Sequence, residues 1–350
     1  MNRITTDHAG LRLFSELLKI PAPSGHEDQM IAFLCDRLVD LGTVPEVDPA
    51  GNVIVRLEGR SPDRPTCCIA AHIDEIGLVV TEIERNGVLH VDRLGGTLPW
   101  KLGETPVEVL GEGETIVGVS SMGSGHSRTQ ASECPSWEAV RVLTGQSSDR
   151  LAEVGIRVGS PIVPARDVRG PFVFGDPTAP WVAAWTFDNR LSVACLLQAL
   201  RRFKEEGLAP LSPMTVAFTV EEEIGCLGAK VLAQRERPDV FIAIDGSPLV
   251  PECPVELDGR PGIRSKDRAA IYDQDLLREI CRIALDAGAE LQPVVYSEAA
   301  SDASLVYSIG GSPRVACLGY VRANSHGFEA APLAAFDHTR TVIEALLTNL

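Results

Sequence analysis

The chain has 350 residues, 45% of them hydrophobic, and a formal net charge of −16. This length predicts two domains, because a single hydrophobic core rarely organises so long a chain. The acidic balance argues against nucleic acid and against an anionic membrane surface as partners, since both repel a negatively charged protein.

Cysteine usage indicates a reducing compartment. The chain has nine cysteines, and four of them stand in apolar runs: Cys67, Cys68, Cys195 and Cys317. That pattern is typical of buried free thiols and not of a disulfide framework. Residues 1–8 lack the apolar core of a signal peptide, and no apolar run reaches membrane-spanning length. We therefore predict a soluble cytoplasmic protein.

The first 77 residues have mixed α/β character. Apolar residues at helical spacing predict a helix over 9–19. Ser24 followed by Glu27 has the pattern of a capping box and predicts a second helix that runs to about Leu41. A turn over 48–52 precedes a predicted strand at 53–55.

The apolar run 67–71 predicts a buried strand that ends in His72 and Asp74. Residues two apart on extended chain face the same side. A carboxylate beside a histidine fixes the tautomer of the ring and makes it a better metal ligand. Taken alone, a histidine at a strand end is more often a hydrogen-bonded structural residue.

Residues 78–172 differ from both flanking parts. Short β-rich runs alternate there with glycine turns, at 78–83, 88–91, 107–110, 115–119, 139–143 and 161–163. This pattern predicts a small β-barrel or β-sandwich domain. We therefore divide the chain into a first catalytic part at 1–77, an insertion at 78–172 and a second catalytic part at 173–350.

Polar residues again follow apolar runs in the second α/β part. Asp188 stands where a strand is expected to meet a helix that runs to about Phe203, a position where aspartate often serves only as a cap. The run 216–220 predicts a buried parallel strand and ends in three consecutive glutamates, 221–223. Such a run can also be a solvated acidic turn.

The rest of the chain continues the alternation. The apolar run 240–244 ends in Asp245, and helices are expected at 267–287 and 301–309. A last strand at 313–319 precedes His326, and a helix is expected over 334–347. The carboxyl ends of parallel strands meet at one edge of a sheet, where α/β proteins bind their ligands. Six side chains are therefore expected to converge: His72, Asp188, Glu222, Glu223, Asp245 and His326.

Two histidines and several carboxylates suit a pair of divalent metal ions that share a carboxylate. The order of these residues resembles that of the dinuclear zinc or cobalt aminopeptidases of the zinc-peptidase-like superfamily. It is most similar to the M42 family of glutamyl and tetrahedral (TET) aminopeptidases. The matching segments are Ser24-Gly25-His26-Glu27, Gly51-Asn52, Ala71-His72-Ile73-Asp74-Glu75-Ile76-Gly77, Asp188-Asn189-Arg190, Thr219-Val220-Glu221-Glu222-Glu223-Ile224-Gly225, Asp245, Ser301-Asp302-Ala303 and His326.

The place of the insertion separates M42 from related families. It lies between Asp74 and Asp188, where M42 enzymes carry a dimerisation domain, whereas M28 enzymes lack it. M20 enzymes carry a lid between the later aspartate and the final histidine, and here that interval holds ordinary α/β elements.

The resemblance implies a three-layer zinc-peptidase-like α/β fold with an inserted β-barrel, and two zinc or cobalt ions per chain. It implies that Asp188 bridges the ions, that His72 and Asp245 complete one site, and that Glu223 and His326 complete the other. Glu222 would be the general base and Asp74 would orient His72. The implied substrate is a peptide with a free N-terminus, and the implied assembly is a dimer-based homo-oligomer, with a tetrahedral dodecamer as one form.

Two departures from the M42 pattern concern the substrate. The segment from Arg322 to His326 is one residue longer than the usual Arg-x-x-His, and 299–301 read Ala-Ala-Ser where Gly-Gly-Thr is usual. An amidase or deacylase acting on a modified or N-acylated small peptide is therefore an alternative. A metal-binding scaffold without catalysis is another, although a pure metal site has no need of Glu222. The sequence leaves open the residue preference, the metal used and the oligomer size.

Overall fold

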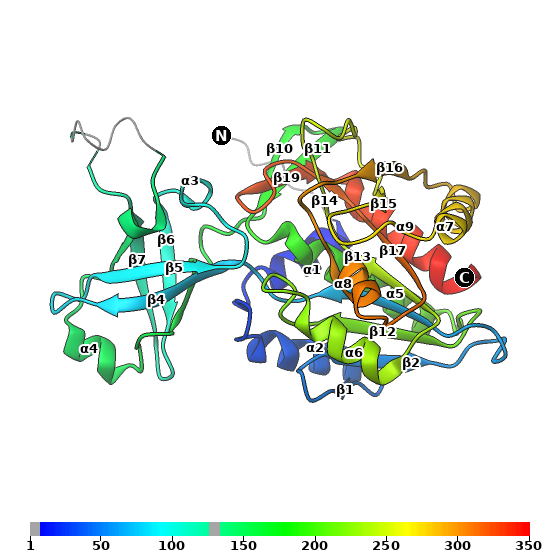
Figure 1. The fold of residues 1–350 in the computed structure, drawn as a ribbon, viewed down its shortest axis with the longest axis horizontal. Coiled ribbons are helices and arrows are strands. Elements are labelled where there is room, and N and C mark those ends of the chain that lie inside the picture. Colours follow the sequence, from blue (N-terminus) through cyan, green and yellow to red (C-terminus); the bar gives the residue numbers. More distant parts are fainter. Residues whose placement is uncertain (1–7, 125, 127–133) are drawn as a thin grey trace.

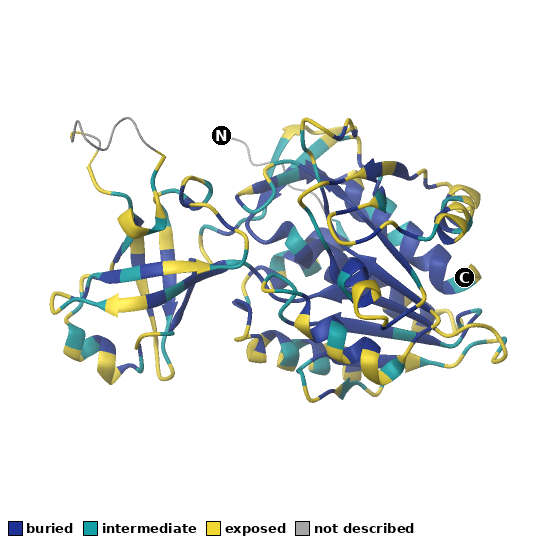
Figure 2. Cartoon of the chain, in the orientation of Figure 1, coloured by how far each residue is buried: buried dark blue, intermediate teal, exposed yellow. Residues whose placement is uncertain are grey.

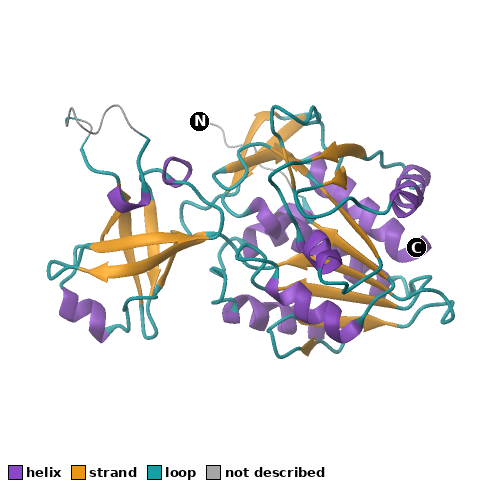
Figure 3. Ribbon diagram, in the orientation of Figure 1, coloured by secondary structure: helices purple, strands orange, loops and turns teal. Residues whose placement is uncertain are grey.

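The computed structural model describes residues 8–124, 126 and 134–350. Residues 1–7, on which the expected lack of a signal peptide rests, lie outside this part. The described chain forms two bodies, a small body built almost wholly of strands and a larger body of strands and helices (Figures 1 and 3). Among the described helices, none combines the length and the apolar character needed to span a membrane.

An eight-stranded sheet forms the centre of the larger body, in the order β1-β2-β12-β3-β13-β17-β15-β16. The bounds are β1 Glu46–Val47, β2 Val53–Leu57, β12 Met214–Thr219, β3 Cys67–His72, β13 Val240–Ile244, β17 Arg314–Gly319, β15 Gly262–Lys266 and β16 Gln292–Val295. The four strands from β12 to β17 run parallel to one another. Every residue of β3 and β13 is buried, because helices cover both faces of the sheet (Figure 2).

Helices form a layer on each face. In one layer α5 (Phe187–Glu205) packs against α1 (Ala9–Leu17) and α9 (Ala334–Asn349), and α9 also contacts α7 (Gln274–Asp286). In the other, α6 (Leu227–Glu236) packs against α8 (Asp302–Ser308). The helix α2 (Asp28–Asp40) contacts β2. The predicted three-layer α/β class is confirmed.

The smaller body is a closed barrel of six strands in the order β4-β5-β8-β7-β6-β9. The bounds are β4 Gly77–Ile83, β5 Leu89–Leu94, β6 Pro106–Leu110, β7 Thr115–Ser121, β8 Arg141–Leu143 and β9 Pro161–Pro164, with the short helices α3 Pro99–Leu102, η1 Trp137–Ala139 and α4 Ser148–Glu153 between them. Each of the six predicted β-rich runs coincides with one strand. The barrel has a hydrophobic core of its own, which includes Leu78, Val107 and Ile162.

A third, antiparallel sheet joins distant segments, in the order β10-β11-β19. Its strands are β10 (Phe172–Asp176), β11 (Ala179–Ala184) and β19 (Glu329–Pro332). A separate two-stranded pair, β14 (Ser247–Pro248) and β18 (Val321–Arg322), lies beside it, and Ala323 just after β18 forms an antiparallel bridge to Ala330 of β19. Because β11 pairs with β19, the chain just before Asp188 lies beside the chain just after His326. Asp188 therefore follows a strand of this small sheet and not, as expected, a strand of the central sheet.

Two local predictions are wrong. The expected capping box does not form, because the Ser24 hydroxyl donates to Asp74 at 2.6 Å and Glu27 accepts from the backbone N–H of Gly25 at 3.0 Å. The helix expected at 267–287 begins only at Gln274, because the Asp267 carboxylate accepts from the N–H groups of Ala269 and Ala270 and holds a turn.

Candidate metal centre

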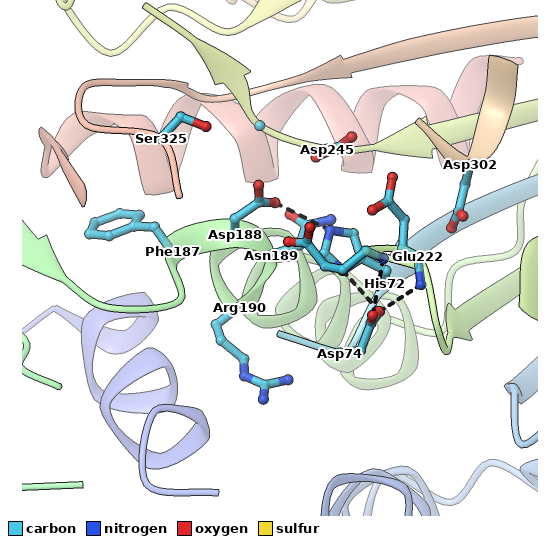
Figure 4. A network of polar contacts seen from close by, with 12 residues as sticks. His72, Asp74, Phe187, Asp188, Asn189, Arg190, Glu222, Asp245, Asp302 and Ser325 are labelled. Carbon is cyan, nitrogen blue, oxygen red and sulfur yellow. Dashed lines mark hydrogen bonds and ion pairs between the residues drawn. The ribbon is translucent and has the colours of Figure 1, made fainter. Parts of the chain in front are cut away.

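Three strands of the central sheet deliver polar residues to one edge. His72 ends β3, Glu222 and Glu223 follow β12, and Asp245 follows β13. The parallel register places His72 beside Thr219, so the side chains leave the sheet at the same level. Figure 4 shows the carboxylates of Asp188, Glu222, Asp245 and Asp302 gathered around His72.

The five expected metal ligands form two clusters that share one residue, and a further cluster joins His72, Glu222 and Glu223. The first comprises His72, Asp188 and Asp245, and the second comprises Asp188, Glu223 and His326. Within each cluster, one ligand atom per residue lies within 4.8 Å of the others. Imidazole nitrogens and carboxylate oxygens are ligands that suit zinc and cobalt. The residues present therefore fit two divalent ions with a common carboxylate.

Asp74 connects His72 to the glutamates. Its carboxylate lies 3.3 Å from Nδ1 of His72, which leaves Nε2 facing Asp188 at 3.2 Å. The same carboxylate accepts from the backbone N–H groups of Glu222 at 2.9 Å and Glu223 at 3.1 Å. Asp74 thus fixes the loop after β12 through its backbone while the two glutamate side chains stay free to act.

His326 reaches the cluster in spite of the extra residue before it. Asn324 and His326 adopt left-handed backbone conformations, with φ of 60° and 59°, which accommodate the longer segment. The ring then faces inward, with Nε2 lying 3.6 Å from Glu223 and 3.7 Å from Asp188. Nδ1 lies 3.1 Å from the carbonyl oxygen of Gly96, which belongs to the inserted segment. The insertion thus supplies the group that orients one of the predicted ligands.

Asp188 is held at the start of α5 by the third sheet. Its backbone N–H donates to Glu329 of β19 at 2.9 Å, and the side chain of neighbouring Asn189 donates to the carbonyl of Ile244 at 2.7 Å. Arg322 forms ion pairs with both Asp188 and Glu329. Burial acts to raise the pKa of Asp188, but the Arg322 guanidinium and His72 hold it well below its usual range.

The remaining carboxylates are crowded. Burial raises the pKa of Glu222 and of Glu223 well above the usual range, and neighbouring carboxylates add to the effect. Burial also raises the pKa of Asp245, although Arg264 lies only 3.0 Å away. Buried carboxylates that resist ionisation become stable anions when cations enter among them, so the electrostatics favour divalent ions here.

The centre opens into a cavity of about 710 Å³. Glu222, Glu223 and His326 lie on its wall, and Tyr296, Ala299 and Ala300 line the part beyond them. The alanines that depart from the M42 pattern therefore face the space that a substrate would fill. A cavity of this size accommodates a small peptide or a modified amino acid.

Sequence reasoning assigned no role at the centre to two buried arginines and one thiol. Arg264 and Arg322 contact the carboxylates of Asp245 and Asp188, and Cys226 contacts Glu222. Arg322 and Cys226 stand in short or irregular segments, and Arg264 lies in β15, a strand that the sequence analysis did not predict. An arginine within a buried strand was the available signal, since an arginine is almost never fully buried without a carboxylate partner.

The sequence model of the M42 glutamyl aminopeptidases matches residues 51–342. The chain belongs to this family. The resemblance inferred from the motifs is therefore confirmed.

Named M42 relatives align over most of the chain. The glutamyl aminopeptidase of Lactococcus lactis is 26% identical over 95% of this chain and 94% of its own. The lysyl aminopeptidase of Pyrococcus furiosus is 30% identical over 67% of this chain and 65% of its own. Among solved structures, the TET1 peptidase of Pyrococcus horikoshii superposes with a TM-score of 0.85 at 26% identity and covers 97% of this chain and all of its own. That peptidase assembles into a tetrahedron or a large octahedral shell.

Proposed function

We propose that this protein is a dinuclear metal-dependent aminopeptidase that removes N-terminal residues from peptides. The observation that carries the proposal is the pair of clusters that share Asp188, with Glu222 beside them on the wall of an open cavity. Membership of the M42 family supports it, as do the glutamyl and lysyl aminopeptidases among the relatives.

We assign the residues as follows. Asp188 would hold both ions, His72 and Asp245 would complete one site, and Glu223 and His326 would complete the other. The ions, zinc or cobalt, would polarise the scissile carbonyl and lower the pKa of a water molecule. Glu222 accepts the proton of the attacking water and passes it to the leaving amine. Asp74 orients His72 and holds the backbone of the glutamate loop.

The test is a panel of substrates assayed with zinc, cobalt and manganese. We expect aminoacyl substrates with a free α-amino group to be cleaved and their N-acylated counterparts to be resistant. Cleavage of the N-acylated set alone would favour the amidase alternative. The motive for this alternative is that Ala299 and Ala300 line the cavity wall where the M42 pattern has glycines. Metal analysis that found no divalent ion bound after incubation with all three would contradict the assignment.

We further propose that the insertion at 78–172 mediates self-association into a dimer-based oligomer. Val119 of β7 pairs with Leu143 of β8, and these two residues are 45% and 47% exposed. Val117, also in β7, is 61% exposed. Such an outward apolar group favours burial against another subunit. Light scattering is expected to give a multiple of the chain mass, with a tetrahedral dodecamer as the largest form in the proposal.

We also propose a cytoplasmic location for the protein. We place it in the cytoplasm because all nine cysteines are free thiols, as the sequence predicted for Cys67, Cys68, Cys195 and Cys317, and those four are buried.

A further inference from the structure

Cys226 lies next to the proposed general base, and no role at the two-ion centre accounts for it. Its thiol donates to Oε1 of Glu222 at 3.5 Å, and its side chain is 3% exposed. The backbone forces this approach, because the N–H of Cys226 donates to the carbonyl of Glu222 at 2.9 Å and closes a turn. Gly225 within that turn has φ of 129°, a conformation that few residues other than glycine adopt.

Asp302 completes a separate cluster with these two residues. One ligand atom each from Glu222, Cys226 and Asp302 lies within 4.8 Å of the others. Asp302 is 3% exposed, and its Oδ2 accepts from the Thr219 hydroxyl at 2.6 Å. Its Oδ1 is buried and has no hydrogen-bond partner within the described chain. A buried acceptor left unpaired costs about 1–3 kcal/mol, so this oxygen is available to a ligand.

The charge around this cluster favours a cation. Six carboxylates lie near His72: Asp74, Asp188, Glu222, Glu223, Asp245 and Asp302. Arg322 is shared between Asp188 and Glu329, and Arg264 between Asp245 and Asp267. Two bound dications would therefore leave the region negative. The cavity that opens onto the centre is also lined by Cys226, so an ion can reach it.

We propose that Cys226, Glu222 and Asp302 form a third, inhibitory site for a thiophilic divalent cation such as zinc or cadmium. A thiolate prefers such ions over magnesium, calcium or manganese. Ligands on one zinc ion lie about 3–4 Å apart, so small side-chain movements close the site. The cation displaces the thiol proton to solvent and takes a lone pair of Glu222. This consequence rests on the proposed function: excess zinc inhibits peptide hydrolysis, because Glu222 bound to the third ion can no longer accept a proton.

The experiment titrates cadmium into protein already loaded with two equivalents of zinc. A thiolate–cadmium charge-transfer absorbance reports the third site, because the two-ion centre contains no thiol. We expect one further equivalent to produce this absorbance and to lower kcat in parallel. Cys226→Ser should abolish the absorbance and raise the inhibitory cadmium concentration by at least about 10-fold, relative to the variant's own activity with two ions. Cys134→Ser, which removes an exposed cysteine, is the matched control and should retain both effects.

Asp302→Asn provides a second variant that keeps the thiol. It should weaken both the absorbance and the inhibition, so the site remains testable if Cys226→Ser folds poorly. The third site would be overturned if the wild-type protein gave no such absorbance. It would also be overturned if Cys226→Ser gave the same absorbance as the wild type. If no aminoacyl substrate is cleaved, the proposed function fails, but the absorbance still decides whether the cation site exists.

Discussion

The two adjacent glutamates after β12 allow a sharp test of roles. Glu222→Gln keeps the size of the side chain and an oxygen that can accept from Cys226, but it cannot take up a proton. The loop should keep its shape, because Asp74 holds it through backbone N–H groups that the substitution does not touch. We therefore expect the variant to fold and to bind two ions.

The size of the effect follows from general base catalysis. Removing a positioned base lowers kcat by about 10²–10⁴-fold, equivalent to about 2.7–5.5 kcal/mol in the activation free energy. Glu223→Gln should behave differently, because it replaces an anionic ligand of the cluster with Asp188 and His326 by a neutral amide. We expect weaker binding of one ion, and a rate that excess metal partly restores.

Metal stoichiometry and kcat are to be measured for both variants. Glu221→Gln is the matched control, since Glu221 precedes them in the same run but belongs to none of the candidate clusters formed by described residues. Loss of metal in Glu222→Gln, with loss of rate alone in Glu223→Gln, would mean that the two roles are exchanged. Unchanged rates in both would refute the assignment of the base.

Four further perturbations test the rest of the centre and the fold. Asp188→Ala should reduce the bound metal from two ions to fewer than one, as elemental analysis would show, because both clusters lose a ligand. Gly96→Ala places a Cβ 2.9 Å from the His326 ring and should weaken metal binding by about 10–100-fold in a calorimetric titration, whereas unaltered affinity would contradict the orienting role of this segment. Val119→Glu should shift the light-scattering mass toward the monomer, and an unchanged mass would place the interface elsewhere. Burial raises the pKa of Glu27 to about 7, so the protonated Glu27 contributes fully to stability below pH 4.5, and this contribution is lost as the pH rises through about 7. The free energy of unfolding of the metal-free wild-type protein in urea should therefore fall by about 2–3 kcal/mol more between pH 5 and pH 8 than that of Glu27→Gln.

The strands that carry the centre were predictable because their signal is local. The apolar runs before His72, Glu222 and Asp245 are buried on both faces, and a polar residue directly after such a run marks the edge of the sheet. The barrel was predictable for a similar reason, since alternating short runs and glycine turns define its strands.

Long-range partners explain the failures. Ser24 has a good local pattern for a helix cap, but its hydroxyl donates to Asp74, fifty positions away. The Asp267 carboxylate likewise competes with the expected helix by accepting from the N–H groups of its own turn. The strand before Asp188 was placed in the wrong sheet because its pairing with β19 depends on residues about 150 positions later.

The contact between Gly96 and His326 has a consequence for how this protein can be altered. The barrel has its own core and looks like a module that could be exchanged or removed (Figure 1). Yet Gly96, in the loop between β5 and α3, supplies the carbonyl oxygen that fixes the His326 ring. A Cβ at this position would lie 2.9 Å from the ring, so glycine is the residue that leaves room for it. A chimera with a foreign insertion would have to reproduce that loop to keep the metal centre. The part of the chain proposed to build the oligomer and the part proposed to cut peptides therefore evolve under a common constraint.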